Sequence, residues 1–364
     1  MNVLLLANHL NVGGITSYVY SLACGLKKEG HNVYVAAGPG DTLSRFKESG
    51  IVFIPAPLNT KAEISFNVAA GLVRLLPQIK EKNINIVHAN TRVTQVLACL
   101  LERFSGTPYV STCHGFFKTR LLRRLLPCWG RKVIAISRQV KEHLVNDFQV
   151  KDEDVRIVHN GIDLERFTCQ APAARQQKKR ELGLGSGPAV GIVARLSDVK
   201  GHIYLIEAMK KVLQDIPEAQ LVIAGEGKMK AGLLSLTRRL GMEQKVFFIP
   251  TLCDTRDVLY ALDMFVLPSL KEGLGLSLME AMACGICAVG SDIGGIKTLI
   301  KHGESGMLVA PKDINGLHVA ISGLLKDPAK MEKMAGKGRQ FIMENFSLEQ
   351  MVSGTEEVYK ECLA

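Results

Sequence analysis

The fold of the second half of this chain is decided by one stretch, Lys271-Glu-Gly-Leu-Gly-Leu-Ser-Leu-Met-Glu-Ala-Met-Ala-Cys-Gly285. Its apolar residues are typical of a helix that begins within the stretch and follows an apolar strand. Gly273 and Gly275 allow a sharp turn between the two elements, because glycine lacks a Cβ atom. The carboxylates of Glu272 and Glu280 flank that turn. We therefore expect a strand, a glycine turn and a helix whose first amides point outward.

This turn offers two kinds of ligand contact. Free amides at a helix start attract phosphate, and carboxylates accept hydrogen bonds from hydroxyl groups. A ligand that carries both phosphates and hydroxyls, such as a nucleotide sugar, would use both kinds of contact. The alternative is a core helix whose two glutamates are solvated.

The spacing of the motif resembles a known signature. Glu-Gly-x-Gly, a second glutamate eight positions after the first, and then Ala-x-Ala-x-Gly are similar to the donor site of retaining GT-B glycosyltransferases of the large fourth family, also called glycosyl transferases group 1. The resemblance implies that Glu272 contacts the sugar hydroxyls and that Glu280 contacts the ribose. It also implies that amides of the turn bind the donor sugar and phosphate, at Gly273, Leu274, Gly275 and Leu276.

Length and composition limit the class of protein. A chain of 364 residues suits two domains of roughly 150–200 residues each. Its 47% hydrophobic and 22% charged residues are typical of a globular protein rather than a disordered one. No run approaches the roughly 18 consecutive apolar residues of a membrane span. Residues 1–7 lack a basic segment and indicate a buried strand rather than a signal peptide, so we expect a cytoplasmic protein.

The chain has nine cysteines, an odd number, and they lie in apolar segments. This pattern favours reduced thiols that serve as small core residues. Cys284 and Cys287 form a Cys-x-x-Cys pair. Because no second pair completes a zinc site, we expect these two to be core cysteines as well.

Apolar strands and amphipathic helices alternate along both halves of the chain. In the first half, strands are expected at 2–7, 31–37, 84–89, 109–112 and 132–136, with helices at 15–28 and 66–81. In the second half, strands are expected at 189–194, 220–224, 246–249, 264–267 and 286–289, with helices at 202–214, 229–240 and 255–262 and after the glycine turn. This pattern is typical of parallel, doubly wound α/β sheets, so each half predicts one Rossmann-like domain.

The domain boundaries follow from where the pattern fades, near residues 160–163 and in the basic, Ala- and Gln-rich stretch 169–180. We expect an N-terminal acceptor-binding domain at 1–164 and a C-terminal nucleotide-sugar-binding domain at 165–345. The resemblance implies the GT-B architecture, in which a cleft separates two such domains. Segment 346–364 resembles the family's closing helix, which crosses back to the N-terminal domain.

Two further motifs are suited to a diphosphate. Gly13 and Gly14 follow the first strand and precede a helix, so their amides could cradle phosphate. The dinucleotide fingerprint Gly-x-Gly-x-x-Gly is absent, but the family has a similar Gly-Gly loop here.

Arg195 and Lys200 follow the first strand of the second half and resemble the family's Arg-Leu and Lys-Gly motif. Two cations at a strand end can neutralise a leaving diphosphate, although many such residues are only surface charges.

Other candidate site residues also follow predicted strands. The family has a histidine near the reacting carbon at the position of His114, where a neutral imidazole could bind the donor sugar; the alternative is a residue that caps the strand. His88 and Asn90 are weaker candidates for the acceptor side. Gly225 and Gly227 resemble the family's turn beneath the nucleotide base, although glycines at such turns are often structural.

One position departs from the family pattern. Lys297 and Thr298 stand where the family commonly has Pro-Glu. This change concerns closure or the acceptor more than the donor.

The net charge of +10 calls for an anionic partner. Its clearest cluster is Lys118–Lys132, in which Arg120, Arg123 and Arg124 alternate with leucine pairs near Trp129. Such a segment resembles an interfacial helix on anionic lipid headgroups. The alternative is a surface helix with a buried leucine stripe and a solvated basic edge.

The resemblance implies retaining transfer of a sugar from a nucleotide sugar, most often a UDP sugar, to a hydroxyl acceptor. A covalent route would need a carboxylate poised against the anomeric carbon, and both candidates are already assigned to hydroxyls. We therefore expect front-face displacement with charge stabilisation by Arg195 and Lys200. No Asp-x-Asp follows a strand, so we expect neither a metal nor another cofactor. The expected acceptor is a lipopolysaccharide, lipid-linked or other cell-envelope glycan precursor, at the inner face of the cell membrane.

Three alternatives remain open. A nucleotide-sugar epimerase of similar architecture would isomerise the donor without an acceptor. A glycosyltransferase with a small, soluble acceptor would need no membrane contact. A nucleic-acid-binding protein is disfavoured, because aromatic residues make up only 6% of the chain and no basic-aromatic strand pattern occurs.

Overall fold

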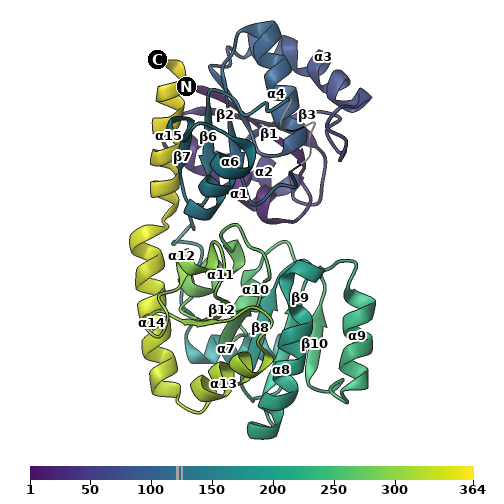
Figure 1. Ribbon diagram of the computed structural model, residues 1–364, viewed down its shortest axis with the longest axis vertical. Coiled ribbons are helices and arrows are strands. Elements are labelled where there is room, and N and C mark those ends of the chain that lie inside the picture. The colour runs from purple at the N-terminus through teal and green to yellow at the C-terminus, as the bar shows by residue number, and fades with distance from the viewer. Residues whose placement is uncertain (120–122, 124–125) are drawn as a thin grey trace. The chain divides into compact units, whose positions relative to one another are not determined.

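The computed structural model describes residues 1–119, 123 and 126–364 and divides the chain into two compact units (Figure 1). Unit 1 comprises Met1–Gly161 and Leu348–Ala364, and unit 2 comprises Ile162–Ser347. The boundaries expected from the sequence lie close to these breaks. No helix in the described ranges combines the length and apolar character needed to cross a bilayer.

Unit 1 alternates strands with helices. In chain order its elements are β1 (Asn2–His9), α1 (Gly14–Lys28), β2 (Asn32–Gly38), α2 (Leu43–Glu48), β3 (Val52–Pro55), α3 (Phe66–Glu81), β4 (Ile86–Ala89), α4 (Arg92–Ser105), β5 (Tyr109–Cys113), β6 (Lys132–Ala135), α6 (Arg138–Phe148), the 3-10 turn η1 (Asp152–Asp154), β7 (Val155–Ile157) and α15 (Leu348–Leu363). The strands form one parallel sheet in the order β3-β2-β1-β4-β5-β6-β7.

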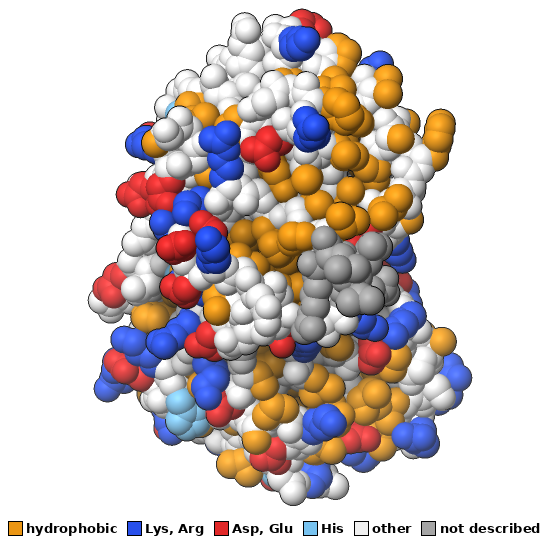
Figure 2. All heavy atoms as spheres, turned by 45° about the horizontal axis from the view of Figure 1, so that its top comes forward, with side chains coloured by type: hydrophobic (Ala, Val, Ile, Leu, Met, Phe, Trp, Pro, Cys, Tyr) orange, Lys and Arg blue, Asp and Glu red, His pale blue; other side chains and the backbone are white. Residues whose placement is uncertain are grey.

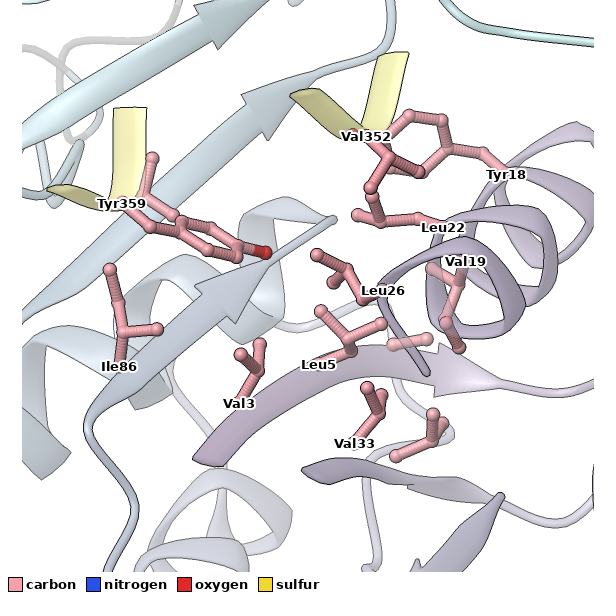
Figure 3. Packing of buried hydrophobic residues seen from close by; sticks show 14 of the residues in the cluster. Val3, Leu5, Tyr18, Val19, Leu22, Leu26, Val33, Ile86, Val352 and Tyr359 are labelled. Carbon is pink, nitrogen blue, oxygen red and sulfur yellow. The ribbon is translucent and has the colours of Figure 1, made fainter. Parts of the chain in front are cut away.

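Alternation along β1 explains how both faces of this sheet are covered. Val3 and Leu5 point to one face and pack with α1 and α15, where Tyr359 belongs to the same buried cluster (Figure 3). Leu4 and Leu6 point to the opposite face and pack with α3 and α4. Because successive side chains alternate, a strand buried on both faces has to be apolar throughout, as this one is.

Unit 2 repeats the arrangement. Its elements are α7 (Pro172–Glu181), β8 (Ala189–Val193), the 3-10 turn η2 (Asp198–Lys200), α8 (His202–Asp215), β9 (Gln220–Ala224), α9 (Lys230–Arg239), β10 (Val246–Ile249), α10 (Arg256–Leu259), β11 (Met264–Leu267), α11 (Leu276–Ala283), β12 (Cys287–Ser291), α12 (Ile296–Leu299), β13 (Met307–Val309), α13 (Ile314–Leu325) and α14 (Pro328–Asn345). Its parallel sheet has the order β10-β9-β8-β11-β12-β13.

The predicted doubly wound α/β architecture is confirmed in both units. In each sheet the strand order reverses next to the first strand, between β1 and β4 in unit 1 and between β8 and β11 in unit 2. Ligands of such sheets bind beyond the carboxyl ends of the strands at this switch point. The stretch 169–180, where periodicity fades, lies within unit 2 and contains helix α7, which begins at Pro172 and was not predicted.

Candidate active site

The switch point of unit 2 is held together by a glycine. Gly201 has φ +73°, and a Cβ atom there would lie 1.9 Å from the carbonyl oxygen of Pro268. The loop after β8 therefore packs directly on the loop after β11, and the amide of Leu270 donates to the Val199 carbonyl at 2.7 Å. This packing brings Lys200 to the glycine turn.

Lys200 forms an ion pair with Glu272, and both side chains are largely buried. The Ser269 hydroxyl lies 3.4 Å from the same carboxylate oxygen. An ammonium group has three protons, so this ion pair leaves donors on Lys200 for a second anion. Two motifs that lie 72 residues apart in the sequence are thus joined at one edge of the sheet.

Arg195 lies on the same loop after β8 as Lys200, and its side chain is exposed. It has no hydrogen bond or ion pair within the described ranges. Gly225 and Gly227 both have positive φ, and Cβ atoms there would lie 2.2 Å and 2.3 Å from the carbonyl oxygens of residues 194 and 196. The two glycines therefore have a structural function: they let the loop after β9 pack on the backbone that carries Arg195.

Glu280 is buried on α11, and its carboxylate accepts a hydrogen bond from the Thr255 hydroxyl at 2.9 Å. Burial raises the pKa of the Glu280 carboxyl to about 7, although the Thr255 bond acts in the opposite direction. Asp254, beside Thr255, is held by Arg166 and Arg256. Sequence reasoning missed Thr255; its place in the loop after β10 was the only available signal.

The glycine turn begins α11 as predicted. Gly275 has φ +102° and occupies the N-cap position. Leu274 has a buried side chain, so only its backbone can contact a ligand. Gly295 packs against the backbone of Gly273 and donates its amide to the Glu272 carbonyl at 3.2 Å. The loop with the unusual Lys297 thus supports the turn, and Lys297 itself pairs with the nearby Asp292 at 3.0 Å.

In unit 1 the switch point carries neutral groups. The Nε2 atom of His114 lies 3.2 Å from Oδ1 of Asn90, and its ring packs edge-on against Tyr18. Burial lowers the pKa of His114 to about 3, so the imidazole is neutral. The Asn90 amide group donates to the carbonyls of residues 6 and 88. Asn90 is therefore engaged in orienting His114.

His88 is fully buried and both of its ring nitrogens are used. Nδ1 lies 2.7 Å from the Tyr359 hydroxyl on α15, and Nε2 lies 2.6 Å from the Thr112 hydroxyl. These contacts tie the last helix to the sheet of unit 1. We therefore leave His88 out of the candidate site.

Gly13 and Gly14 are exposed at the start of α1, and no atom lies within 4 Å of a Cβ built at either position. Packing therefore does not require glycine here. A close approach of a ligand to the backbone would require it.

In the structure, two residues of the basic stripe predicted at 118–132 are engaged in contacts within the protein. Arg120 and Arg124 lie outside the described residues. Arg123 pairs with Glu63, and Trp129 is only 7% exposed in contact with Phe148. Arg123 and Trp129 are therefore not free for lipid headgroups.

All nine cysteines are free thiols, and burial raises the pKa of both Cys284 and Cys287 to about 12. Cys284 and Cys287 are core residues, as predicted. Cys169 and Cys253 are exposed, so the expectation that the nine cysteines serve as core residues was wrong for these two. Across the described ranges, no three His, Cys, Asp or Glu side chains gather in a way that could hold a metal ion.

Comparisons with known proteins identify the family. The family model "Glycosyl transferases group 1" matches residues 174–341, and "Glycosyltransferase Family 4" matches residues 12–166. The UDP-Gal:alpha-D-GlcNAc-diphosphoundecaprenol alpha-1,3-galactosyltransferase of Escherichia coli is 28% identical, over 79% of this chain and 78% of that protein. The N-acetyl-alpha-D-glucosaminyl L-malate synthase of Bacillus anthracis is 29% identical, over 78% of this chain and 76% of that protein.

Among solved structures, Anabaena HepE in complex with UDP and glucose has a TM-score of 0.88 at 22% identity, and the match covers 99% of both chains. This likeness concerns the fold. Because the two family models together match most of the sequence, and both sheets have the corresponding fold, the chain belongs to the fourth family of glycosyltransferases, which have the GT-B fold.

Proposed function

We propose that this protein is a retaining glycosyltransferase that transfers a sugar from a nucleotide-sugar donor, with UDP as the expected nucleotide, to a hydroxyl acceptor. The observation that carries the proposal is the Lys200–Glu272 ion pair at the switch point of unit 2. It joins a cation suited to a diphosphate with a carboxylate suited to sugar hydroxyls. The UDP and UDP-sugar names among the similar proteins support the donor class.

Unit 2 would hold the donor. Lys200, the exposed Arg195 and the first amides of α11 would bind the diphosphate, and Glu272 would accept hydrogen bonds from the sugar. Glu280 would accept hydrogen bonds from the ribose in place of the one it now accepts from Thr255. The glycine turn at 273–276 would contribute backbone only, in keeping with the buried side chain of Leu274.

Unit 1 would contribute to the reacting centre. His114 is neutral and oriented by Asn90, so it could hydrogen-bond the donor sugar without repelling the positive charge that develops on the sugar ring. The exposed backbone at Gly13 and Gly14 suits the diphosphate. The acceptor would bind at unit 1.

The proposed step is front-face displacement. The anomeric carbon–oxygen bond to the diphosphate breaks, the acceptor oxygen bonds to the same face, and the acceptor proton passes to the departing phosphate oxygen. Arg195 and Lys200 stabilise the charge that develops on the leaving group. Because two cations are present where an acidic pair would hold a metal, we propose that transfer is metal-independent.

For the acceptor we propose a lipid-linked or other cell-envelope glycan precursor, with the enzyme acting at the inner face of the cell membrane. The E. coli relative is named for a diphosphoundecaprenol acceptor, which supports this class. The B. anthracis relative is named for malate, so a small soluble acceptor is the alternative outcome of the test.

The test has two stages. Thermal shift with a panel of UDP, GDP and ADP sugars should single out one donor, because a ligand that binds the native state raises the melting temperature. Proton NMR of the product formed with lipid-linked and soluble acceptors should then show the anomeric configuration of the donor. An inverted product would refute the retaining mechanism, and isomerised donor in the absence of acceptor would indicate an epimerase.

A further inference from the structure

Helix α3 is apolar on two opposite faces, although part of it lies at the surface of unit 1. Its inner face is buried and packs on α4, where a Cβ atom at Gly71 would lie 3.3 Å from Leu97. The opposite face repeats at the spacing of a helix, and its exposed apolar residues are Phe66, Ala69, Val73 and Pro77. Exposed apolar residues that recur on one face of a helix are typical of an interaction surface, so this outer face is a candidate for contact with a partner.

The exposure of this face is unusually high. Phe66 is 85% exposed and Val73 is 74% exposed, and Ile64, just before the helix, is 65% exposed. Among the described large hydrophobic residues, none is more exposed than Phe66. Figure 2 shows hydrophobic side chains gathered over unit 1, on the side where Figure 1 places α3 and α4.

A buried ion cluster fixes the segment before α3. Glu63 accepts a hydrogen bond from Nε of Arg92 at 3.0 Å and another from Nε of Arg123 at 2.7 Å. Arg92 also donates to the carbonyl oxygens of Leu126 and Pro127. The cluster therefore ties the residues before α3 to the segment that carries the exposed Leu126.

The charges around this face are mainly positive, because the exposed Glu81 at the end of α3 pairs with Lys82. Glu63 is the only acidic residue between Glu48 and Glu81, and its charge is already matched by two arginines. No acidic residue occurs at 103–141. The exposed cations beside the apolar residues therefore have no acidic neighbours in these segments; they are Lys61, Arg74 and Lys118.

We propose that this outer face of α3 docks unit 1 on an anionic lipid bilayer. Phe66 and Val73 would enter the boundary between headgroups and acyl chains, and Lys61, Arg74 and Lys118 would contact lipid phosphates. The excess of positive charge favours an anionic bilayer over a second copy of this basic chain. The surface shares only Lys118 with the stripe predicted at 118–132, and the inference rests on the proposed function and deepens its lipid-linked acceptor.

The test is co-sedimentation of the full chain with vesicles of phosphatidylcholine alone or mixed with phosphatidylglycerol. The variant is Phe66→Glu with Val73→Glu. The control is Val319→Glu on α13 of unit 2, because Val319 is also exposed, at 67%. We expect wild type and control to bind anionic vesicles, the double variant to bind about tenfold more weakly or worse, and binding to fall at about 1 M salt.

Equal binding by wild type and the double variant, or no binding by wild type, would overturn the proposal. So would a wild-type dimer in light scattering that the double variant dissociates, since the face would then be an interface between copies. The melting temperature of the double variant shows whether it folds. We expect it to match that of the wild type, because both substituted positions are exposed. UDP binding is measured on the same samples: its absence from all of them would refute the proposed donor without affecting the docking surface.

Discussion

The two sheets reverse their strand order at equivalent places, yet one switch point carries charged side chains and the other carries neutral ones. In unit 2 the edge bears charges, namely Lys200 paired with Glu272 and an exposed Arg195, beside the buried carboxyl of Glu280, whose pKa is raised by burial. In unit 1 the corresponding edge bears a neutral histidine, His114, and an amide that orients it. The fold therefore places a candidate ligand site at each switch point, and the side chains determine which chemical group each edge suits.

The contrast is consistent with the part of the substrate proposed to bind at each edge. A diphosphate requires cations, and its charge grows as the bond to the sugar breaks. A sugar that becomes positively charged is better served by a neutral imidazole than by another cation. Substitutions at the charged edge should therefore impair the donor chemistry.

The largest effect is expected from the cations of unit 2. Lys200→Ala and Arg195→Ala should each lower kcat by on the order of a hundredfold, with a smaller effect on the donor KM, because they act on charge that develops in the transition state. Steady-state kinetics with the donor from the panel measures both constants. If donor affinity falls while kcat holds, the two residues are binding groups and the proposed mechanism is wrong.

A smaller loss is expected from the carboxylates. Glu272→Ala and Glu280→Ala should each weaken transfer by at least about tenfold, because hydrogen bonds that involve a charged group contribute roughly 1.5–3 kcal/mol. Circular dichroism should show that both variants remain folded. Unchanged kcat/KM in both variants would contradict the donor site.

The raised pKa of Glu280 predicts a change in stability with pH. Between about pH 4.5 and 7 the unfolded carboxyl ionises while the buried one stays protonated, so the wild type loses stability as pH rises. Glu280→Gln cannot ionise and should therefore be more stable than wild type above pH 7, by on the order of 3 kcal/mol, because a tenfold change in acidity corresponds to about 1.4 kcal/mol. The gain should vanish below pH 4.5. Melting curves across this range check it, and a gain that does not vary with pH would rule out ionisation as its cause.

Removal of divalent metal ions is expected to have no effect on transfer. Transfer should keep its full rate in excess EDTA, because two cations stand where an acidic pair would hold a metal. Loss of activity that magnesium or manganese restores would show that the cations of unit 2 do not suffice.

Much of the fold could be predicted from local sequence. The apolar runs at β1 and β8 and the glycine turn before α11 specify their elements without help from distant residues. Helix α7 escaped prediction because only Lys179 on it is buried, so it has almost no apolar periodicity. Its start at Pro172 was the one available signal.

The site was less predictable, because its contacts join distant segments. Lys200 and Glu272 could be named from their motifs, but their ion pair depends on the packing of Gly201 on Pro268. His88 was mispredicted for the same reason. Its position near the end of a strand suggests a ligand contact, but in the folded chain its ring bonds to Tyr359 of α15, which is distant in the sequence. Thr255 has no motif, and only its bond to Glu280 reveals it.

The most direct measurement is a calorimetric titration with UDP, or with whichever nucleoside diphosphate the donor panel selects. The central claim is that the charged edge of unit 2 binds the nucleotide. We therefore expect one site per chain in the wild type, an affinity at least about tenfold weaker in Glu280→Ala, and an unchanged affinity in His114→Ala, because a free nucleoside diphosphate has no sugar for His114 to contact. Equal affinities of wild type and Glu280→Ala, or a loss confined to His114→Ala, would contradict the claim.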